Sequence, residues 1–204
     1  LNCQPDLSGT GLDPQWVWDA LAGTSHVIVE GTQGYGLGLH SPYYPQVTSS
    51  DCTAVDFLSM AGISPWHPLV DDLHIWVVAR VYPIRVAGNS GPLEGETTWR
   101  ELGLQAERTT VTNKIRRVGQ WNPMLVKQAV RANGGGADIS KTVKLALTML
   151  DQMFPDVTGI DNPTDLRKHR AAVTFMRDVQ AQTGARIGLV GTSPTTVVEI
   201  GGWL

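Results

Sequence analysis

Short apolar runs rich in β-branched residues alternate along this chain with stretches of helical spacing. The apolar runs are typical of buried strands, and the helical stretches place apolar residues three or four positions apart. The runs that predict strands cover residues 27–30, 73–86, 144–150, 186–190 and 197–200, the second with a break at Tyr82-Pro83. The stretches that predict helices cover residues 14–22, 54–60, 98–102, 123–132 and 163–183. Strands that alternate with helices predict an α/β fold with a mainly parallel sheet and crossover helices.

Glycine and proline mark the ends of several of these elements. Pro123 suits the first turn of a helix, and the glycines of residues 134–136 end that helix. The long helix over residues 163–183 has Asn162 or Thr164 near its cap and Gly184 at its end. The chain shows no internal repeat and no clear domain boundary, so we expect one domain over residues 1–204.

The composition narrows the class of protein. Apolar residues make up 42% of the 204 residues, which supports a real core. The net charge of −3 and the dispersed basic residues argue against a nucleic-acid-binding surface. No apolar run approaches the roughly 20 residues needed to span a bilayer, and no signal-peptide pattern opens the chain. Cys3 and Cys52 are too few for a disulfide framework, so we expect a cytoplasmic protein.

The segment over residues 27–54 carries the most informative pattern. An apolar run delivers Glu30 to a strand end, where it anchors a turn, and a glycine-rich loop follows. Ligands of open α/β sheets bind just past the carboxyl ends of strands, so this loop predicts a site. The Gln33 carboxamide offers a donor and an acceptor, and Thr48-Ser49-Ser50 offers hydroxyls and N–H groups to a phosphate. Alternatively, Thr48-Ser49-Ser50 caps a helix over residues 51–60.

Five groups of residues follow the order of one family's motifs. They are residues 30–34 (EGTQG) together with 44–50 (YPQVTSS), then 82–86 (YPIRV), 109–119 (TTVTNKIRRVG), 147–151 (LTMLD) and 191–194 (GTSP). In this order they resemble the adenylosuccinate synthetases, and the TTVT-x-x-x-RR form is most similar to the short archaeal and phage branch. The resemblance covers nearly the whole chain but only the C-terminal half of the family pattern.

The resemblance implies a ligase that joins L-aspartate to IMP at the expense of GTP and forms adenylosuccinate. It implies Mg²⁺ as a cofactor and GTP or ATP as the energy donor. Some members of the phage branch take dGMP in place of IMP and make 2-aminoadenine nucleotides. The residues that the resemblance assigns are Gln33, Thr48 and Val86 for the purine nucleotide, Thr109, Thr110, Thr112 and Lys114 for aspartate, and Arg116, Asp151, Thr192, Ser193 and Pro194 for GTP or ATP.

Several of these assignments have a physical rationale and an alternative. Threonine hydroxyls beside a cation suit the two carboxylates of aspartate. However, Lys114 stands where the classical family pattern has an arginine, and a lysine lacks the two-pronged geometry of arginine. The alternative for the segment around Lys114 is a solvated basic loop. The Asp151 carboxylate can accept from guanine N1–H and the 2-amino group together, a pair that adenine lacks. The alternative for Asp151 is a turn residue at a strand end. Met149 and Ala87 depart from the lysine and glycine of the family pattern.

The first half of the family pattern has no counterpart in this sequence. That half holds a phosphate-binding G-D-E-G-K-G-K loop with the catalytic Asp, and a catalytic His, and neither motif occurs here. We therefore assign no catalytic residue and interpret His40 as a surface-loop histidine. We expect the chain to need an N-terminal half supplied elsewhere, or to form a homo-oligomer. A nucleotide-binding regulatory module without catalysis is the alternative.

Overall fold

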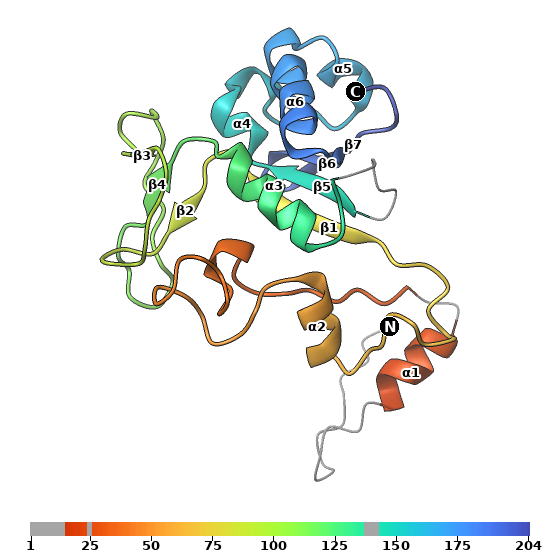
Figure 1. Ribbon diagram of the computed structural model, residues 1–204. Helices are drawn as coiled ribbons and strands as arrows, with labels where there is room; N and C mark the ends of the chain where they lie inside the picture. Colours follow the sequence, from red (N-terminus) through yellow and green to blue (C-terminus); the bar gives the residue numbers. More distant parts are fainter. Residues whose placement is uncertain (1–14, 24–25, 137–142) are drawn as a thin grey trace.

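The computed structural model describes residues 15–23, 26–136 and 143–204 (Figure 1). The predictions for Cys3 and for Pro14 at a helix start lie outside these ranges. The sheet at the centre of the fold has the strand order β1-β5-β6-β7. Its first three strands run parallel and β7 runs antiparallel, which confirms the mainly parallel sheet expected from the sequence. The strands are β1 (Ile75–Arg80), β5 (Val143–Thr148), β6 (Arg186–Ser193) and β7 (Thr196–Glu199).

Helices α3 (Pro123–Ala132) and α6 (Arg170–Thr183) pack beside each other on one face of this sheet (Figure 1). The Asn122 side chain caps α3 by accepting from the N–H groups of Met124 and Leu125, at 3.0 and 3.1 Å. Gly184, at φ 74°, ends α6 in the left-handed conformation that glycine adopts without strain. The core between sheet and helices contains fully buried Leu145, Leu147, Val130, Met176, Val179 and Val190.

Short elements connect β5 to α6 on the same side of the sheet. They are α4 (Leu150–Met153), η2 (Pro155–Val157) and α5 (Pro163–Leu166). Leu150, Val157 and Leu166, one from each element, are fully buried in the main core. Each of these short elements therefore anchors the crossover from β5 to its parallel neighbour β6 in the main core.

A second, smaller sheet lies beyond the carboxyl end of β1 (Figure 1). Its antiparallel strands have the order β2-β4-β3, with β2 (Ile84–Arg85), β3 (Glu96–Thr97) and β4 (Arg117–Gly119). Gly119 is buried where a Cβ atom would stand 2.8 Å from the Glu94 carbonyl oxygen, so this position requires glycine. The strand break predicted at Tyr82-Pro83 therefore separates two sheets.

The N-terminal part forms its own layer below β1 in Figure 1. It contains α1 (Gln15–Ala22), η1 (Tyr35–Leu37) and α2 (Ala54–Met60). Val17, Leu58 and Ile63 form a small core there. The N–H of Ala54 donates to Asn133 Oδ1 at 2.7 Å, so the start of α2 is tied to the end of α3.

Two predicted elements of the N-terminal part differ from the structure. Residues 27–30 are not a strand, because this extended segment has no neighbouring strand to pair with among the described residues. Val27 and Val29 pack on the small core, while Ile28 is 90% exposed. The helix expected over residues 51–60 begins only at Ala54, and Thr53 is its N-cap, not Thr48-Ser49-Ser50. The Thr53 N–H and hydroxyl both donate to Asp56, which closes the capping box.

Three further predicted elements differ from the structure. The single helix predicted over residues 163–183 is two helices, because His169 is non-helical and its Nδ1 binds Asp156 Oδ2 at 2.6 Å. Residues 98–102 form a turn, in which the Glu101 carboxylate accepts from Thr97 and Thr98. The strand predicted over residues 144–150 ends at Thr148, since Met149 has a left-handed φ of 64° and α4 starts next to it.

Candidate functional site

The loop over residues 33–50 is closed by backbone hydrogen bonds. Thr48 N–H donates to the Leu37 carbonyl at 2.7 Å, and Leu39 N–H donates to Ser50 at 3.1 Å. Gln33 lies at the start of this loop with φ 68° and an exposed side chain. Neither the Gln33 carboxamide nor the Thr48 hydroxyl binds another described residue, so both polar groups are available to a ligand.

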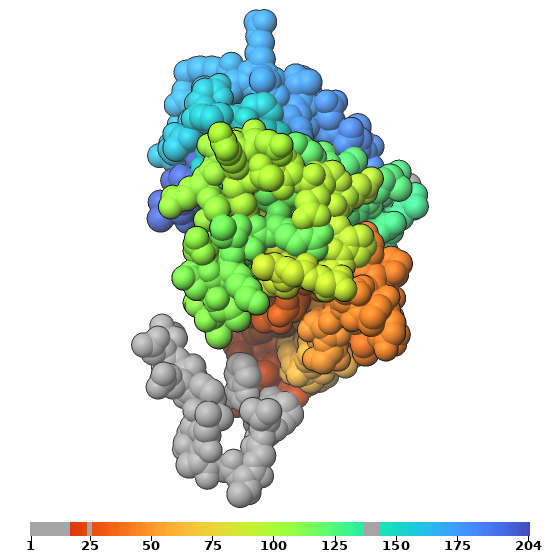
Figure 2. Space-filling view, turned by 90° about the vertical axis from the view of Figure 1, so that its left-hand side faces the viewer, coloured from red at the N-terminus to blue at the C-terminus, as the bar shows by residue number. Residues whose placement is uncertain are grey.

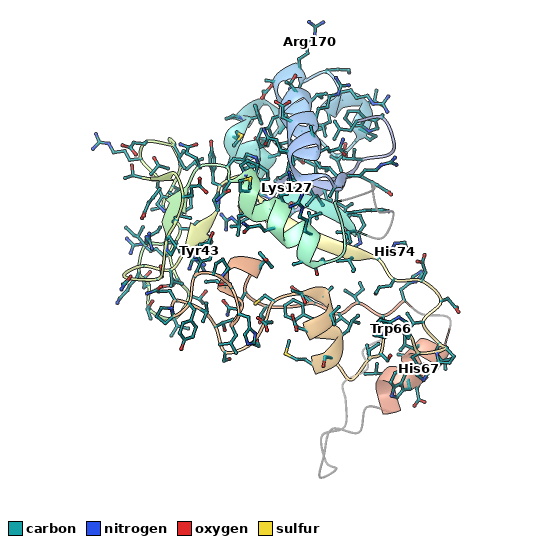
Figure 3. The ribbon with its side chains drawn as sticks, in the orientation of Figure 1. Tyr43, Trp66, His67, His74, Lys127 and Arg170 are labelled. Atoms are coloured by element: carbon teal, nitrogen blue, oxygen red, sulfur yellow. The ribbon has the colours of Figure 1, made fainter. Side chains whose placement is uncertain are left out.

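Arg85 joins this loop to the second sheet, and the sequence-based assignment missed it. Its Nη1 donates to the Ser90 carbonyl at 2.5 Å and its Nη2 to the Gly36 carbonyl at 3.3 Å. The guanidinium also lies 5.1 Å from the ring centre of Tyr43, which Figure 3 shows beside β2. Arg85 is only 8% exposed, and burial lowers its pKa. The arginine of the YPIRV motif was the only signal in the sequence.

Val86 follows Arg85 and is 52% exposed at the end of β2. The Arg85 contact to Gly36 brings this end of β2 against the loop that carries Gln33 and Thr48. The structure therefore brings the three residues predicted for the purine nucleotide onto two neighbouring segments.

His40 and Asp51 form a second tie across the same loop. Asp51 accepts from the His40 N–H at 3.0 Å, and its other oxygen lies 2.5 Å from His40 Nδ1. The hydrogen bond from Asp51 raises the pKa of His40, and the pKa of Asp51 is lowered by its hydrogen bonds to His40. His40 is exposed, as expected, in an open hollow that Leu39, Ser41 and Tyr44 also line.

The four residues predicted for aspartate lie on one hairpin over residues 107–116. An isolated antiparallel bridge between Arg108 and Ile115 holds its stem. The Thr109 and Thr112 hydroxyls lie 2.6 Å apart and bind each other, and Lys114 N–H donates to Thr109 Oγ1 at 3.0 Å. Thr110 and Lys114 are exposed, and their side chains bind no other described residue. Hydrogen bonds within the hairpin therefore set the conformation of its tip, while the side chains of Thr110 and Lys114 have no partner among the described residues.

Buried and charged contacts attach the hairpin to the sheets. Glu107, at its base, forms a two-pronged ion pair with Arg80 at the carboxyl end of β1. Trp99, 6% exposed, donates from Nε1 to the Arg116 carbonyl at 2.7 Å. This fixes the backbone of Arg116, whose guanidinium binds no described residue.

Of the five residues predicted for GTP or ATP, Arg116 lies on the hairpin, and the other four lie at or just after the ends of the adjacent parallel strands β5 and β6. Asp151 stands in the first turn of α4, immediately after β5, and its carboxylate binds no described residue. Thr192 lies near the carboxyl end of β6, but it is fully buried and its hydroxyl donates to the Ile160 carbonyl at 2.7 Å. Ser193 donates to Thr196 at 2.8 Å, and Pro194 is exposed. Asp151 is thus free for a ligand, whereas the Thr192 side chain has a structural partner.

The segments that carry these groups reach the same face of the molecule. Figure 2 shows that face, with residues near 100 in the middle, the N-terminal loop in orange below and the α4 region in cyan above. The carboxyl ends of β1 and β6 carry Arg80 and Ser193, and Asp151 follows β5 in the first turn of α4. Carboxyl ends of parallel strands are the usual ligand side of an open α/β sheet.

Two further structural findings concern metals and membranes. The described part of the chain contains no group of three or more His, Cys, Asp or Glu side chains that could hold a metal ion. Within the same ranges, no helix is both long and apolar enough to cross a bilayer.

The fold and the free polar groups define an α/β protein with a candidate ligand site at its strand ends. A family model described as adenylosuccinate synthetase matches residues 12–154, and the chain belongs to the adenylosuccinate synthetase family. It is 38% identical over 184 residues to the adenylosuccinate synthetase of Pyrococcus horikoshii, covering 88% of this chain and 49% of that protein. It is also 41% identical over 117 residues to the N6-succino-2-amino-2'-deoxyadenylate synthase of Vibrio phage phiVC8, covering 55% and 33% respectively.

Two solved structures share the fold. The cyanophage S-2L succinoaminodeoxyadenylate synthetase, bound to dGMP and dATP, matches with a TM-score of 0.68 and 26% identity, covering 92% of this chain and 50% of that one. The adenylosuccinate synthetase of Plasmodium falciparum matches with a TM-score of 0.67 and 19% identity, covering 92% and 53%. The chain spans about half the length of the curated archaeal relatives it matches.

Proposed function

We propose that this chain is the C-terminal half of a ligase of adenylosuccinate synthetase type, which joins L-aspartate to IMP at the expense of GTP. The observation that carries the proposal is the match of residues 12–154 to the adenylosuccinate synthetase family model, together with 38% identity to the Pyrococcus synthetase over 184 residues. Three motif groups support it further. Each group presents polar side chains that have no partner among the described residues: Gln33 and Thr48, Thr110 and Lys114, and Arg116 and Asp151.

In this proposal, the chain positions the substrates and stabilises their charge. The triphosphate phosphorylates the purine 6-oxygen, and the aspartate amine then displaces that phosphate. Such chemistry depends mainly on positioning and on electrostatic stabilisation. Gln33, Thr48 and Val86 hold the purine nucleotide, while Lys114 and the Thr110 hydroxyl face the aspartate carboxylates. The Asp and His that act on the purine ring come from the other half of the enzyme.

Asp151 selects the base of the energy donor. A free carboxylate accepts two hydrogen bonds from guanine N1–H and the 2-amino group, and adenine cannot make that pair. Thr192 contributes through its backbone, because its buried hydroxyl already binds Ile160.

In this proposal Mg²⁺ would accompany the triphosphate, because Mg²⁺ is usually held by one or two carboxylates together with the phosphates of the substrate.

A second candidate keeps the chemistry and changes the acceptor to dGMP. Two phage proteins favour it: the phiVC8 synthase at 41% identity, and the cyanophage structure, whose protein binds dGMP and dATP. On this alternative the energy donor is an adenine nucleotide, and Asp151 does not read guanine.

Titration calorimetry with GTP and ATP tests the assignment of Asp151, and titration with IMP, GMP and dGMP tests the acceptor. We expect Asp151→Asn to weaken GTP binding by roughly 10- to 100-fold, because one charged hydrogen-bond acceptor is worth about 1.5–3 kcal/mol. The matched control is Asp178→Asn, an exposed aspartate on α6, which should leave both affinities unchanged. The second candidate, with dGMP as the acceptor, would be favoured if ATP bound more tightly than GTP and dGMP bound more tightly than IMP. Binding of none of the five nucleotides would remove both.

A further inference from the structure

The loop over residues 33–50 is held closed by contacts between residues 37–40 and residues 48–51. Backbone hydrogen bonds join the two segments, and a side chain reinforces them. The His40 N–H donates to Asp51 Oδ1 at 3.0 Å, and His40 Nδ1 lies 2.5 Å from Asp51 Oδ2. A Cβ atom on Gly38 would stand 3.3 Å from Asp51 Oδ1, so the carboxylate packs directly against the loop backbone.

Asp51 stands at a sensitive position for an anionic ligand. It follows directly after Thr48-Ser49-Ser50, whose hydroxyls and N–H groups are the predicted phosphate contacts. Its side chain is 31% exposed, and a partly buried charge is screened less than one in bulk water. An uncompensated carboxylate there would repel a nucleotide phosphate.

The protonation of His40 decides whether the Asp51 charge is compensated. The protonated imidazole and the carboxylate together form a neutral pair. When the imidazole loses its proton, Nδ1 can still donate a hydrogen bond, but the pair then carries a charge of −1. The deprotonated pair therefore holds the loop less tightly and leaves a negative charge beside the predicted phosphate contacts.

Neighbouring groups do not take over this role. The other titratable or charged groups near the pair are Asp56 in the first turn of α2, Cys52, Tyr44 and Arg85. The Asp56 charge favours protonated His40. Burial raises the pKa of the Cys52 thiol from 9.0, so the thiol stays uncharged up to pH 8. Arg85 donates to the Ser90 and Gly36 carbonyls instead. Among these described neighbours of Asp51, His40 is the group whose charge changes around neutral pH.

We propose that His40 is a positioning residue of the purine nucleotide site and acts on that site through Asp51. The inference rests on the proposed function, because Gln33 and Thr48 on this loop are the residues assigned to the nucleotide. The site therefore binds a purine monophosphate more tightly below neutral pH than above it. The hydrogen bond from Asp51 raises the pKa of His40 from 6.5, so the effect is fully present below pH 6.5 and is lost as the pH rises through the folded value.

The first measurement is titration calorimetry of the chain with IMP and with dGMP between pH 5.5 and pH 8. We expect the affinity of wild type to fall about three- to tenfold more than that of His40→Asn over this range. The asparagine Nδ2 stands where the imidazole Nδ1 stood, so the variant keeps a donor to Asp51 but cannot titrate. Comparing the two proteins also removes the ionisation of the ligand, since a phosphate monoester has its second pKa near 6.

The matched control is His74→Asn, which removes a similar pair outside the loop. His74 Nε2 lies 3.1 Å from Asp72 Oδ2, and both side chains are exposed; Figure 3 shows His74 just before β1. We expect H74N to follow the pH dependence of wild type. Equal pH dependence of nucleotide affinity in wild type and H40N would overturn the proposal.

Amide hydrogen exchange tests the loop without a ligand. Protection factors of the Leu39 and Thr48 N–H groups report loop closure, because both groups donate across the loop, and they correct for the intrinsic pH dependence of exchange. We expect both factors to fall several-fold in wild type from pH 5.5 to pH 8, and to stay constant in H40N and in Asp51→Asn. Constant protection in wild type would overturn the proposal. A loop that loses protection as expected, in a chain that binds neither IMP nor dGMP at any pH, would support the positioning role of His40 and contradict the proposed function.

Discussion

Both terminal nitrogens of Arg80 bind the Glu107 carboxylate, Nη1 to Oε2 at 3.2 Å and Nη2 to Oε1 at 2.5 Å. The two side chains are 22% and 28% exposed, so water screens this pair only in part. The contact joins the carboxyl end of β1 to the base of the hairpin over residues 107–116. The central sheet thereby sets where the hairpin stands.

Removing this pair should loosen the hairpin. We expect Arg80→Ala to lower the free energy of unfolding by about 1–2 kcal/mol, since hydrogen bonds to a charged group are lost and Glu107 stays partly buried. Aspartate binding to the complete enzyme should weaken, with little change in nucleotide binding. Chemical denaturation and aspartate titration measure the two effects, with exposed Arg100→Ala as the control. A double-mutant cycle with Glu107→Ala that gives no coupling energy would refute the role of the pair.

Arg85 should not tolerate lysine. A lysine lacks the planar fork that reaches the Ser90 and Gly36 carbonyls together and stacks over Tyr43. We expect Arg85→Lys to cost about 1–3 kcal/mol of stability and to weaken purine nucleotide binding. Arg131→Lys, at an exposed position on α3, serves as the control. Unchanged nucleotide affinity in a stable R85K protein would show that this loop does not depend on Arg85.

His40 should titrate above its ordinary value. Asp51 binds the imidazole and raises the pKa of His40 from 6.5. Because the folded-state pKa is raised, the stabilisation is fully present below pH 6.5 and is lost as the pH rises through the folded value. NMR titration of the His40 ring should show the raised pKa, and Asp51→Asn should return it toward 6.5. Equal titration in both proteins would exclude the pair in solution.

The stability contributed by the Glu96–Arg117 pair should have the opposite pH dependence. The Arg117 guanidinium donates to both oxygens of Glu96, at 2.7 and 2.6 Å, and lowers its pKa from 4.5. The stability from this pair is therefore present above pH 4.5 and is lost as the pH falls through the folded value. The Glu96 side chain is 43% exposed, so we expect less than about 1 kcal/mol. Glu96→Gln should be less sensitive to acid than wild type in denaturation at pH 3–6, and an unchanged pH profile would contradict the assignment.

The sequence predicted most of the helices and strands whose ends are set by residues in or next to the element itself. Pro123 and the glycines after Ala132 bound α3 as expected, and the apolar run after residue 143 forms a buried parallel strand. Residues 27–30 were wrongly predicted as a strand, because a strand also needs a neighbour that its own sequence does not specify. The helix over residues 163–183 is interrupted at His169 by the contact with Asp156, thirteen positions away, which periodicity cannot detect.

In the candidate site, too, the sequence predicted local features but not the contacts between distant residues. Motif order predicted Gln33, Lys114 and Asp151, and the structure leaves all three side chains without described partners. Their binding roles stay predictions. The ties that position the site were not predictable, because the Arg80–Glu107 pair spans 27 positions and the Arg85–Gly36 contact spans 49. The burial of the Thr192 hydroxyl also depends on a distant carbonyl, that of Ile160.

We infer that this chain supplies half of a synthetase-type active site. The most direct measurement is chromatographic detection of a succinylated purine nucleotide, made from L-aspartate and IMP with GTP and Mg²⁺ by the chain together with the unmatched half of the Pyrococcus synthetase. We predict product from the two halves together and none from either half alone, with loss of most product on Lys114→Ala. Absence of product from IMP, GMP and dGMP, with either GTP or ATP as energy donor and although the two halves associate, would contradict the claim.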